Sequence, residues 1–114
     1  MRAGHRLDVE RRGTSCGHEY EILGHSFSKM VTVEPTLVTL KRDSDIFPTF
    51  QHVGSEFIYM LSGVLTYHHG GVLYTLKRGD SLFFDATTPH GPQELVRTPI
   101  RFLSVIAYAP LAEE

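Results

Sequence analysis

Two histidines and one glutamate stand out in this sequence for their side-chain chemistry and their spacing. His52 and Glu56 lie four residues apart, before an apolar segment that ends at Gly63, and His90 follows a second apolar segment. Neutral imidazoles and a carboxylate suit Fe(II), Mn(II), Zn(II) or Ni(II), and two histidines with one carboxylate can form a facial triad that leaves coordination positions open. If folding brings His90 to the first pair, the sequence predicts a site for one divalent transition metal.

Hydrogen bonding without a metal is the other interpretation of the same three residues. The two histidines could lie at the mouth of a barrel and bond to Glu56, whose burial as an unpaired carboxylate would be costly. The sequence leaves both states open, one with a metal and one without.

The segment around Glu56 has the alternation of a β-strand. Strand side chains point to two faces in turn, so one face carries Phe50, His52, Glu56, Ile58 and Met60. The opposite face carries Phe57, Tyr59 and Leu61. Because both faces are apolar beyond Glu56, we expect the barrel interior to cover one of them and a second sheet layer or a second subunit to cover the other.

Short apolar segments separated by glycine-containing turns recur along the whole chain. Ser62-Gly63 predicts a tight hairpin, and the segment 29–40 predicts two short strands or one bent strand around Pro35. No stretch of about 12 residues without glycine or proline has a convincing helical period. The pattern predicts one all-β domain at residues 17–114, a small antiparallel β-barrel or sandwich, after an N-terminal arm or edge strand at residues 1–16.

Composition limits the classes of function. A formal charge of −2 argues against direct binding of nucleic acid, which calls for a basic surface. Cys16 is the only cysteine, so no internal disulfide can form and the chain fits a reducing compartment. No apolar run approaches the roughly 20 residues that span a bilayer. We therefore expect a cytoplasmic protein without a membrane partner.

The two histidine-containing segments resemble the two motifs that define the cupin superfamily of small β-barrels. The first motif has the form G-x5-H-x-H-x3,4-E-x6-G, and His52, Glu56 and Gly63 match its second histidine, its acid and its last glycine. The second has the form G-x5-P-x-G-x2-H-x3-N, and Gly79 and His90 stand at the matching separation. The resemblance implies a jelly-roll fold, also called a double-stranded β-helix, with His52, Glu56 and His90 as metal ligands.

Several positions of the sequence depart from the cupin motifs. Phe50 stands at the first histidine, so one of the usual four ligands is missing. Asp85, Thr87 and Glu94 stand at the proline, glycine and asparagine positions of the second motif, and we expect Asp85 to be a loop cap rather than a ligand. The resemblance implies a ligand pocket lined by Phe50, Ile58, Met60, Phe83 and Tyr20.

Three segments resemble a more specific group, the C-terminal cupin domain of bacterial regulators with an N-terminal XRE-type helix-turn-helix. They are GHEYEILG (17–24), EFIYMLSGVLTY (56–67) and LKRGDSLFFDATTPHG (76–91). The resemblance implies a domain that senses a small-molecule effector, within a transcriptional regulator or as a free-standing relative. We expect a homodimer because strands that are apolar on both faces need to be covered. A small metal-dependent enzyme, a dioxygenase or isomerase acting on a small substrate, and a metal-free dimerisation domain stay open as alternatives.

Overall fold

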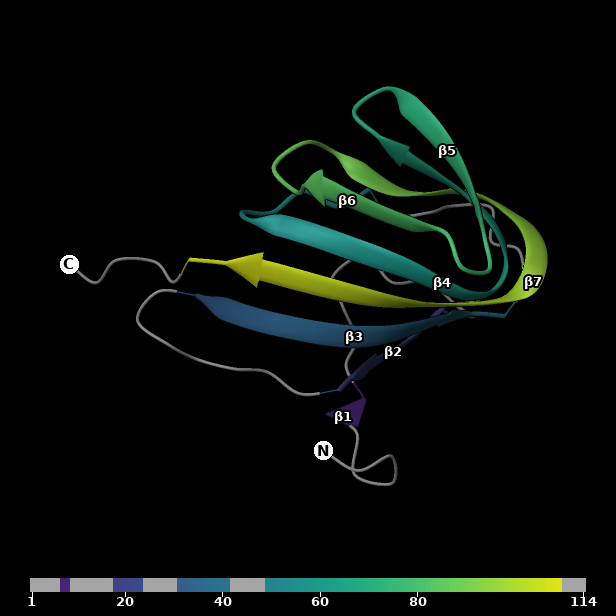
Figure 1. Ribbon diagram of the computed structural model, residues 1–114, viewed down its shortest axis with the longest axis horizontal. Helices are drawn as coiled ribbons and strands as arrows, with labels where there is room; N and C mark the ends of the chain where they lie inside the picture. Colours follow the sequence, from purple (N-terminus) through teal and green to yellow (C-terminus); the bar gives the residue numbers. More distant parts are fainter. Residues whose placement is uncertain (1–6, 9–17, 24–30, 42–48, 110–114) are drawn as a thin grey trace.

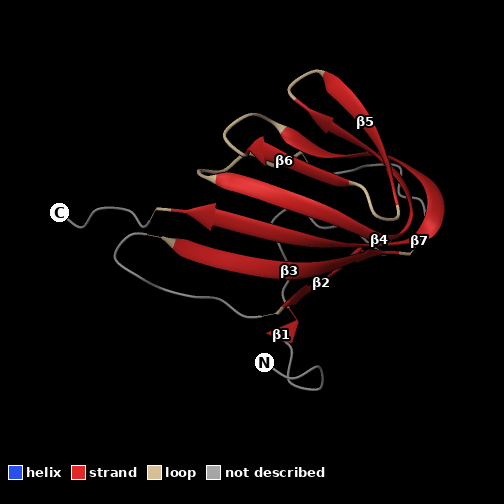
Figure 2. Ribbon diagram, in the orientation of Figure 1, coloured by secondary structure: helices blue, strands red, loops and turns tan. Residues whose placement is uncertain are grey.

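The computed structural model describes residues 7–8, 18–23, 31–41 and 49–109 (Figure 1). These residues form seven β-strands and no helix, so the predicted all-β class is confirmed (Figure 2). The described ranges accordingly hold no helix that could cross a membrane. Cys16 and most of the expected N-terminal arm lie outside the described residues. The strands are β1 (Leu7–Asp8), β2 (His18–Ile22), β3 (Thr32–Leu40), β4 (Ser55–His69), β5 (Val72–Lys77), β6 (Ser81–Asp85) and β7 (His90–Tyr108).

Two long strands, β4 and β7, organise the antiparallel sheet. The hydrogen-bonded order is β1-β2-β3-β7-β4-β5, and β6 pairs with β4 as well. The first part of β4 runs between β6 and the end of β7, whereas its second part runs between β5 and the start of β7. Because β4 and β7 both bend, the sheet curls over on itself and encloses an interior (Figure 1).

The chain does not turn back at Ser62-Gly63, so the hairpin predicted there is wrong. β4 continues through this point with register shifts against β7. Gly63 has a φ of +82°, and a Cβ atom there would lie 2.6 Å from the carbonyl oxygens of Arg97 and Pro99. Glycine therefore allows the two paired strands to approach closely at an irregularity of the bulge type, which bends β4 instead of ending it.

The segment that contains Pro35 forms the single strand β3. Pro35 lies opposite Val105 of β7, and its carbonyl oxygen accepts a hydrogen bond of 2.9 Å from the amide of Leu23. Of the two alternatives for this segment, one continuous strand is therefore the one observed, and it begins at Thr32.

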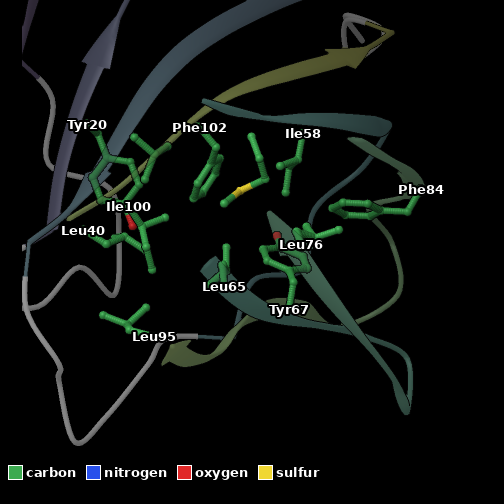
Figure 3. Packing of buried hydrophobic residues seen from close by; sticks show 12 residues of the cluster. Tyr20, Leu40, Ile58, Leu65, Tyr67, Leu76, Phe84, Leu95, Ile100 and Phe102 are labelled. Atoms are coloured by element: carbon green, nitrogen blue, oxygen red, sulfur yellow. The ribbon is translucent and has the colours of Figure 1, made fainter. Parts of the chain in front are cut away.

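The face of β4 that carries Glu56 points into the core, as the alternation predicts. Ile58 and Met60 are completely buried, whereas Tyr59 and Leu61 on the other face are about 40% exposed. Burial of such a large apolar side chain contributes roughly 1.5–3 kcal/mol, so this register is strongly fixed. Figure 3 shows the buried cluster, which comprises Tyr20, Val38, Leu40, Ile58, Met60, Leu65, Tyr67, Leu76, Phe84, Leu95, Ile100 and Phe102.

Candidate metal centre

The fold brings His52, Glu56 and His90 together. Glu56 lies near the start of β4, His52 in the segment before it, and His90 at the start of β7. One potential ligand atom from each residue lies within 4.8 Å of the other two. Oε1 of Glu56 is 3.2 Å from Nε2 of His52 and 3.3 Å from Nε2 of His90. The three residues that the sequence singled out thus converge on one point.

The other ring nitrogen of each histidine faces a backbone carbonyl. Nδ1 of His90 is 2.8 Å from the oxygen of Thr88, and Nδ1 of His52 is 3.1 Å from the oxygen of Val53. A carbonyl oxygen can only accept a hydrogen bond, so each Nδ1 carries the proton in these contacts. With Nδ1 protonated, Nε2 carries a lone pair when the ring is neutral and donates to Glu56 when the ring is protonated. The 3.2 Å contact of His52 Nε2 with Oε1 of Glu56 is within hydrogen-bond distance.

Three electron-rich atoms that face one another need positive charge between them. Nε2 of His90 is buried and has no hydrogen-bond partner in the described part of the chain, although Oε1 of Glu56 is only 3.3 Å away. Either a proton on each ring or one cation shared by the three atoms removes the repulsion. Carbonyl groups commonly orient metal-bound histidines through the second ring nitrogen, so the donor set fits a divalent transition metal.

Glu56 is ionised at neutral pH although it is only 4% exposed. Burial by itself raises the pKa of this carboxyl group, but the contacts with His52 and His90 and a hydrogen bond from Ser104 outweigh it and lower the pKa to about 2. The hydroxyl of Ser104 donates to Oε2 at 2.8 Å, which leaves Oε1 facing the histidines. The carboxylate is thus charged and oriented as a metal ligand has to be.

Ser104 was not among the residues predicted for the site. It lies on β7, opposite Ile58 of β4, and its side chain is completely buried. The signal that could have marked it is its even spacing from Phe102 and Ile106, because residues two apart on a strand share a face.

The loop before His90 is fixed by a cap at Asp85. Oδ1 of Asp85 accepts hydrogen bonds from the backbone amide and the hydroxyl of Thr87, at 3.0 and 2.8 Å, and these bonds lower the pKa of Asp85. Nε2 of His69 lies 2.9 Å from the carbonyl oxygen of Asp85. The expected role of Asp85 as a cap is confirmed, and the capped loop places the Thr88 carbonyl that orients His90.

Two spaces lined by described residues adjoin the site. One is a narrow interior cavity of about 10 Å³, room for about one water molecule, lined by Tyr20, Val38, Phe50, Glu56, Tyr67, Pro92, Phe102 and Ser104. The other is an open depression of about 240 Å³ lined by Glu34, His52, Val53, Ile106 and Tyr108. Only the second has room for a ligand of several atoms, and it reaches the site at His52.

The predicted pocket residues do not all line one space. Tyr20 and Phe50 line the narrow cavity, and their role in ligand binding stays a prediction. Ile58 and Met60 are completely buried in the core and line neither space. The prediction that Phe83 lines the pocket is wrong, because its side chain is 71% exposed on the outer face of β6. The next residue, Phe84, points inward instead, and its ring centre lies 4.8 Å from that of His90.

The family model described as a cupin domain (Cupin_2) matches residues 36–106. This range is more than half of the chain, and it contains all three residues of the candidate centre. The chain belongs to the cupin family. No curated protein matches the sequence.

Several solved structures share the fold at low sequence identity. Hydroxypropylphosphonic acid epoxidase from S. wedmorenis is 19% identical with a TM-score of 0.73, and the match covers 93% of this chain and 57% of the epoxidase chain. KdgF from Halomonas sp. is 18% identical with a TM-score of 0.71, and the match covers 97% of this chain and 92% of the KdgF chain. An HTH_3 family transcriptional regulator from Vibrio cholerae is 20% identical with a TM-score of 0.67, and the match covers 82% of this chain and 52% of the regulator chain. The matched part is thus little more than half of the epoxidase and of the regulator.

Proposed function

We propose that this chain is a small-molecule-binding cupin domain that holds one divalent transition metal, Fe, Mn, Zn or Ni, between His52, Glu56 and His90. The observation that carries the proposal is the convergence of two Nε2 atoms on Oε1 of a buried carboxylate, with no hydrogen-bond partner for Nε2 of His90 in the described residues. When bound, such a metal supplies an electrophilic centre with open positions for a donor atom of a ligand. Phe50 stands where the cupin motif has a further histidine, so three protein ligands leave more positions open than four would.

We further propose that the domain senses a small effector within, or beside, a transcriptional regulator. Support comes from the three regulator-like segments of the sequence and from the fold shared with the regulator from Vibrio cholerae. Binding without turnover is therefore the function that we place first. An effector would shift the domain between two arrangements by binding one of them more tightly.

The sensing role includes a homodimer in the cytoplasm, with DNA contacted by another domain or protein. Support for the dimer is an apolar outer face on β4 and β6, where Tyr59, Leu61 and Phe83 are 40%, 39% and 71% exposed. Large exposed apolar patches commonly mark protein interfaces. Sedimentation velocity at micromolar concentration is expected to give the mass of a dimer, and a monomer mass would refute this part of the proposal.

A small metal-dependent enzyme, an oxygen-using dioxygenase or an isomerase, is the second candidate function. The open depression beside His52 favours it, because a substrate can reach the site directly from solvent. The same three ligands would then hold the metal, and the two candidates differ only in what happens to the bound molecule.

A thermal-shift screen of small carboxylic acids, phenols and sugars against metal-loaded protein separates these functions. The sensing proposal predicts a compound that raises the melting temperature of the wild type but not of Glu56→Gln, and that mass spectrometry recovers unchanged after prolonged incubation. Consumption of oxygen, or a new product from the compound, would establish the enzyme instead. If no compound binds and none is converted, both proposals are wrong.

A further inference from the structure

A second open depression lies at the bend of β4, on the outer surface of the sheet. Its volume is about 330 Å³, and it is lined by Leu61, Ser62, Gly63, Val64, Lys77, Arg78 and Arg97. It shares no residue with the metal centre or with the two spaces beside that centre. A function for this depression is therefore independent of the proposed metal site.

Strand register places two positively charged residues of the depression, Lys77 and Arg97, on either side of Val64. This residue lies opposite Lys77 on β5 and opposite Arg97 on β7. Residues directly opposite one another on neighbouring strands share a face, and two strand spacings separate the Cα atoms of the two cations by roughly 10 Å. Arg78 follows directly in the turn after β5, so three positive charges surround one hollow.

Nothing among the described residues neutralises these charges. No acidic residue is among the described residues that line the depression. None of the three cations, Lys77, Arg78 and Arg97, forms an ion pair with a described residue. The carboxylate of Asp80 in the same turn accepts the backbone amide of Lys77 at 2.9 Å. Glu94, opposite Thr66 on the same outer face, does not line the depression.

Lys41, outside the depression, differs from these cations because it forms an ion pair. Lys41 lies 2.7 Å from the carboxylate of Glu19, so its charge already has a partner. Lys77 and Arg97 instead line a hollow that also includes Gly63 at the bend. Ser62 adds a neutral hydroxyl donor at the same place.

We propose that this depression is a binding site for a phosphate group of a small molecule. An arginine fork matches the oxygens of a phosphate with two parallel hydrogen bonds, and lysine adds a point charge. A dianion offsets more of the three positive charges than a single carboxylate does. The hollow is within the size range of small-ligand sites, and because it is open to solvent the binding is weak and sensitive to salt.

Inorganic phosphate is the direct probe, added to isotope-labelled full-length chain and followed by amide chemical shifts in two-dimensional NMR at low ionic strength. The expected result is a saturable change confined to the amides of 61–64, 77–78 and 97. Sodium chloride at matched ionic strength and sodium acetate are the comparison arms. Non-saturable shifts equal to those with sodium chloride would overturn the site, and acetate binding as tightly as phosphate would overturn the phosphate class.

Charge-removing variants test the contributions of Lys77 and Arg97. Arg97→Gln and Lys77→Gln are each expected to weaken phosphate binding about two- to fivefold, and the double variant about tenfold. Arg97→Lys keeps the charge without the fork and is expected to fall between Arg97→Gln and the wild type. Lys41→Gln removes one charge elsewhere and is expected to leave the affinity unchanged. Equal weakening by Lys41→Gln would show that only net charge matters and would contradict the proposal.

Discussion

The hydroxyl of Ser104 donates a 2.8 Å hydrogen bond to Oε2 of Glu56, from a residue 48 positions away in the chain. This bond fixes the carboxylate so that Oε1 faces both histidines. Ser104→Ala is expected to weaken Zn(II) binding about tenfold or more, as loss of a group that orients a metal ligand commonly does. It should also lower the free energy of unfolding by about 1.5–3 kcal/mol, because a buried charged acceptor loses its donor.

Competition titration with a zinc indicator and urea unfolding measure these two effects. Ser81→Ala is the matched control, since Ser81 is exposed on β6, and both quantities should stay close to those of the wild type. Unchanged zinc affinity in Ser104→Ala would mean that this serine does not position the ligand.

Acid should destabilise the metal-free protein through Glu56. Its pKa is about 2 in the folded protein and 4.5 ordinarily, so ionisation of Glu56 favours folding. This contribution is complete above pH 4.5 and is lost as the pH falls from 4.5 towards 2; it is on the order of 3 kcal/mol. Urea unfolding at pH 7, 4.5 and 3 should show a steeper loss in the wild type than in Glu56→Gln. The same slope in both proteins would contradict the low pKa.

Phe50→His should supply the missing fourth ligand. The backbones of Phe50 and His90 pair through hydrogen bonds of 2.7 and 2.9 Å, and their ring centres lie 6.2 Å apart. A histidine at this position is expected to tighten metal binding by at least about tenfold, as followed by the same zinc competition. Phe50→Leu keeps an apolar wall and should leave the affinity near that of the wild type. If both variants bind alike, position 50 does not face the metal.

Two glycines with similar backbone angles should respond differently to alanine. Gly63 and Gly79 have φ values of +82° and +89°, but a Cβ atom at Gly63 meets backbone oxygens at 2.6 Å, whereas one at Gly79 has no neighbour within 4 Å. Gly79→Ala should cost about 1–2 kcal/mol of unfolding free energy from the backbone angle alone. Gly63→Ala should cost about 3 kcal/mol or more, since the paired strands β4 and β7 must also move apart. Similar costs in urea unfolding would contradict the close approach of β4 and β7 at Gly63.

Local sequence patterns predicted the all-β class and the inward face of β4. They predicted a hairpin at Ser62-Gly63 because a hairpin and a bulge share the same local signature. The outcome depends on β7, whose residues Arg97 and Pro99 lie close to that glycine in space but far away in the sequence. Such a distant partner is invisible to a local pattern.

The site shows the same division between local and distant information. His52, Glu56 and His90 were predictable because their spacings match a family motif. Ser104 was not, because its role depends on a strand partner that the local sequence does not specify. Phe83 and Phe84 are adjacent aromatic residues, so a one-residue ambiguity in register decided which one points inward.

Metal content tests the central claim most directly. The wild type and Glu56→Gln are purified without chelator, incubated with Fe(II), Mn(II), Zn(II) or Ni(II), desalted, and measured by inductively coupled plasma mass spectrometry. We expect about one equivalent of at least one of these metals in the wild type and a large loss in Glu56→Gln, because an amide is a much weaker ligand than a carboxylate. Less than about a tenth of an equivalent in the wild type, or equal amounts in both proteins, would contradict a metal centre at His52, Glu56 and His90.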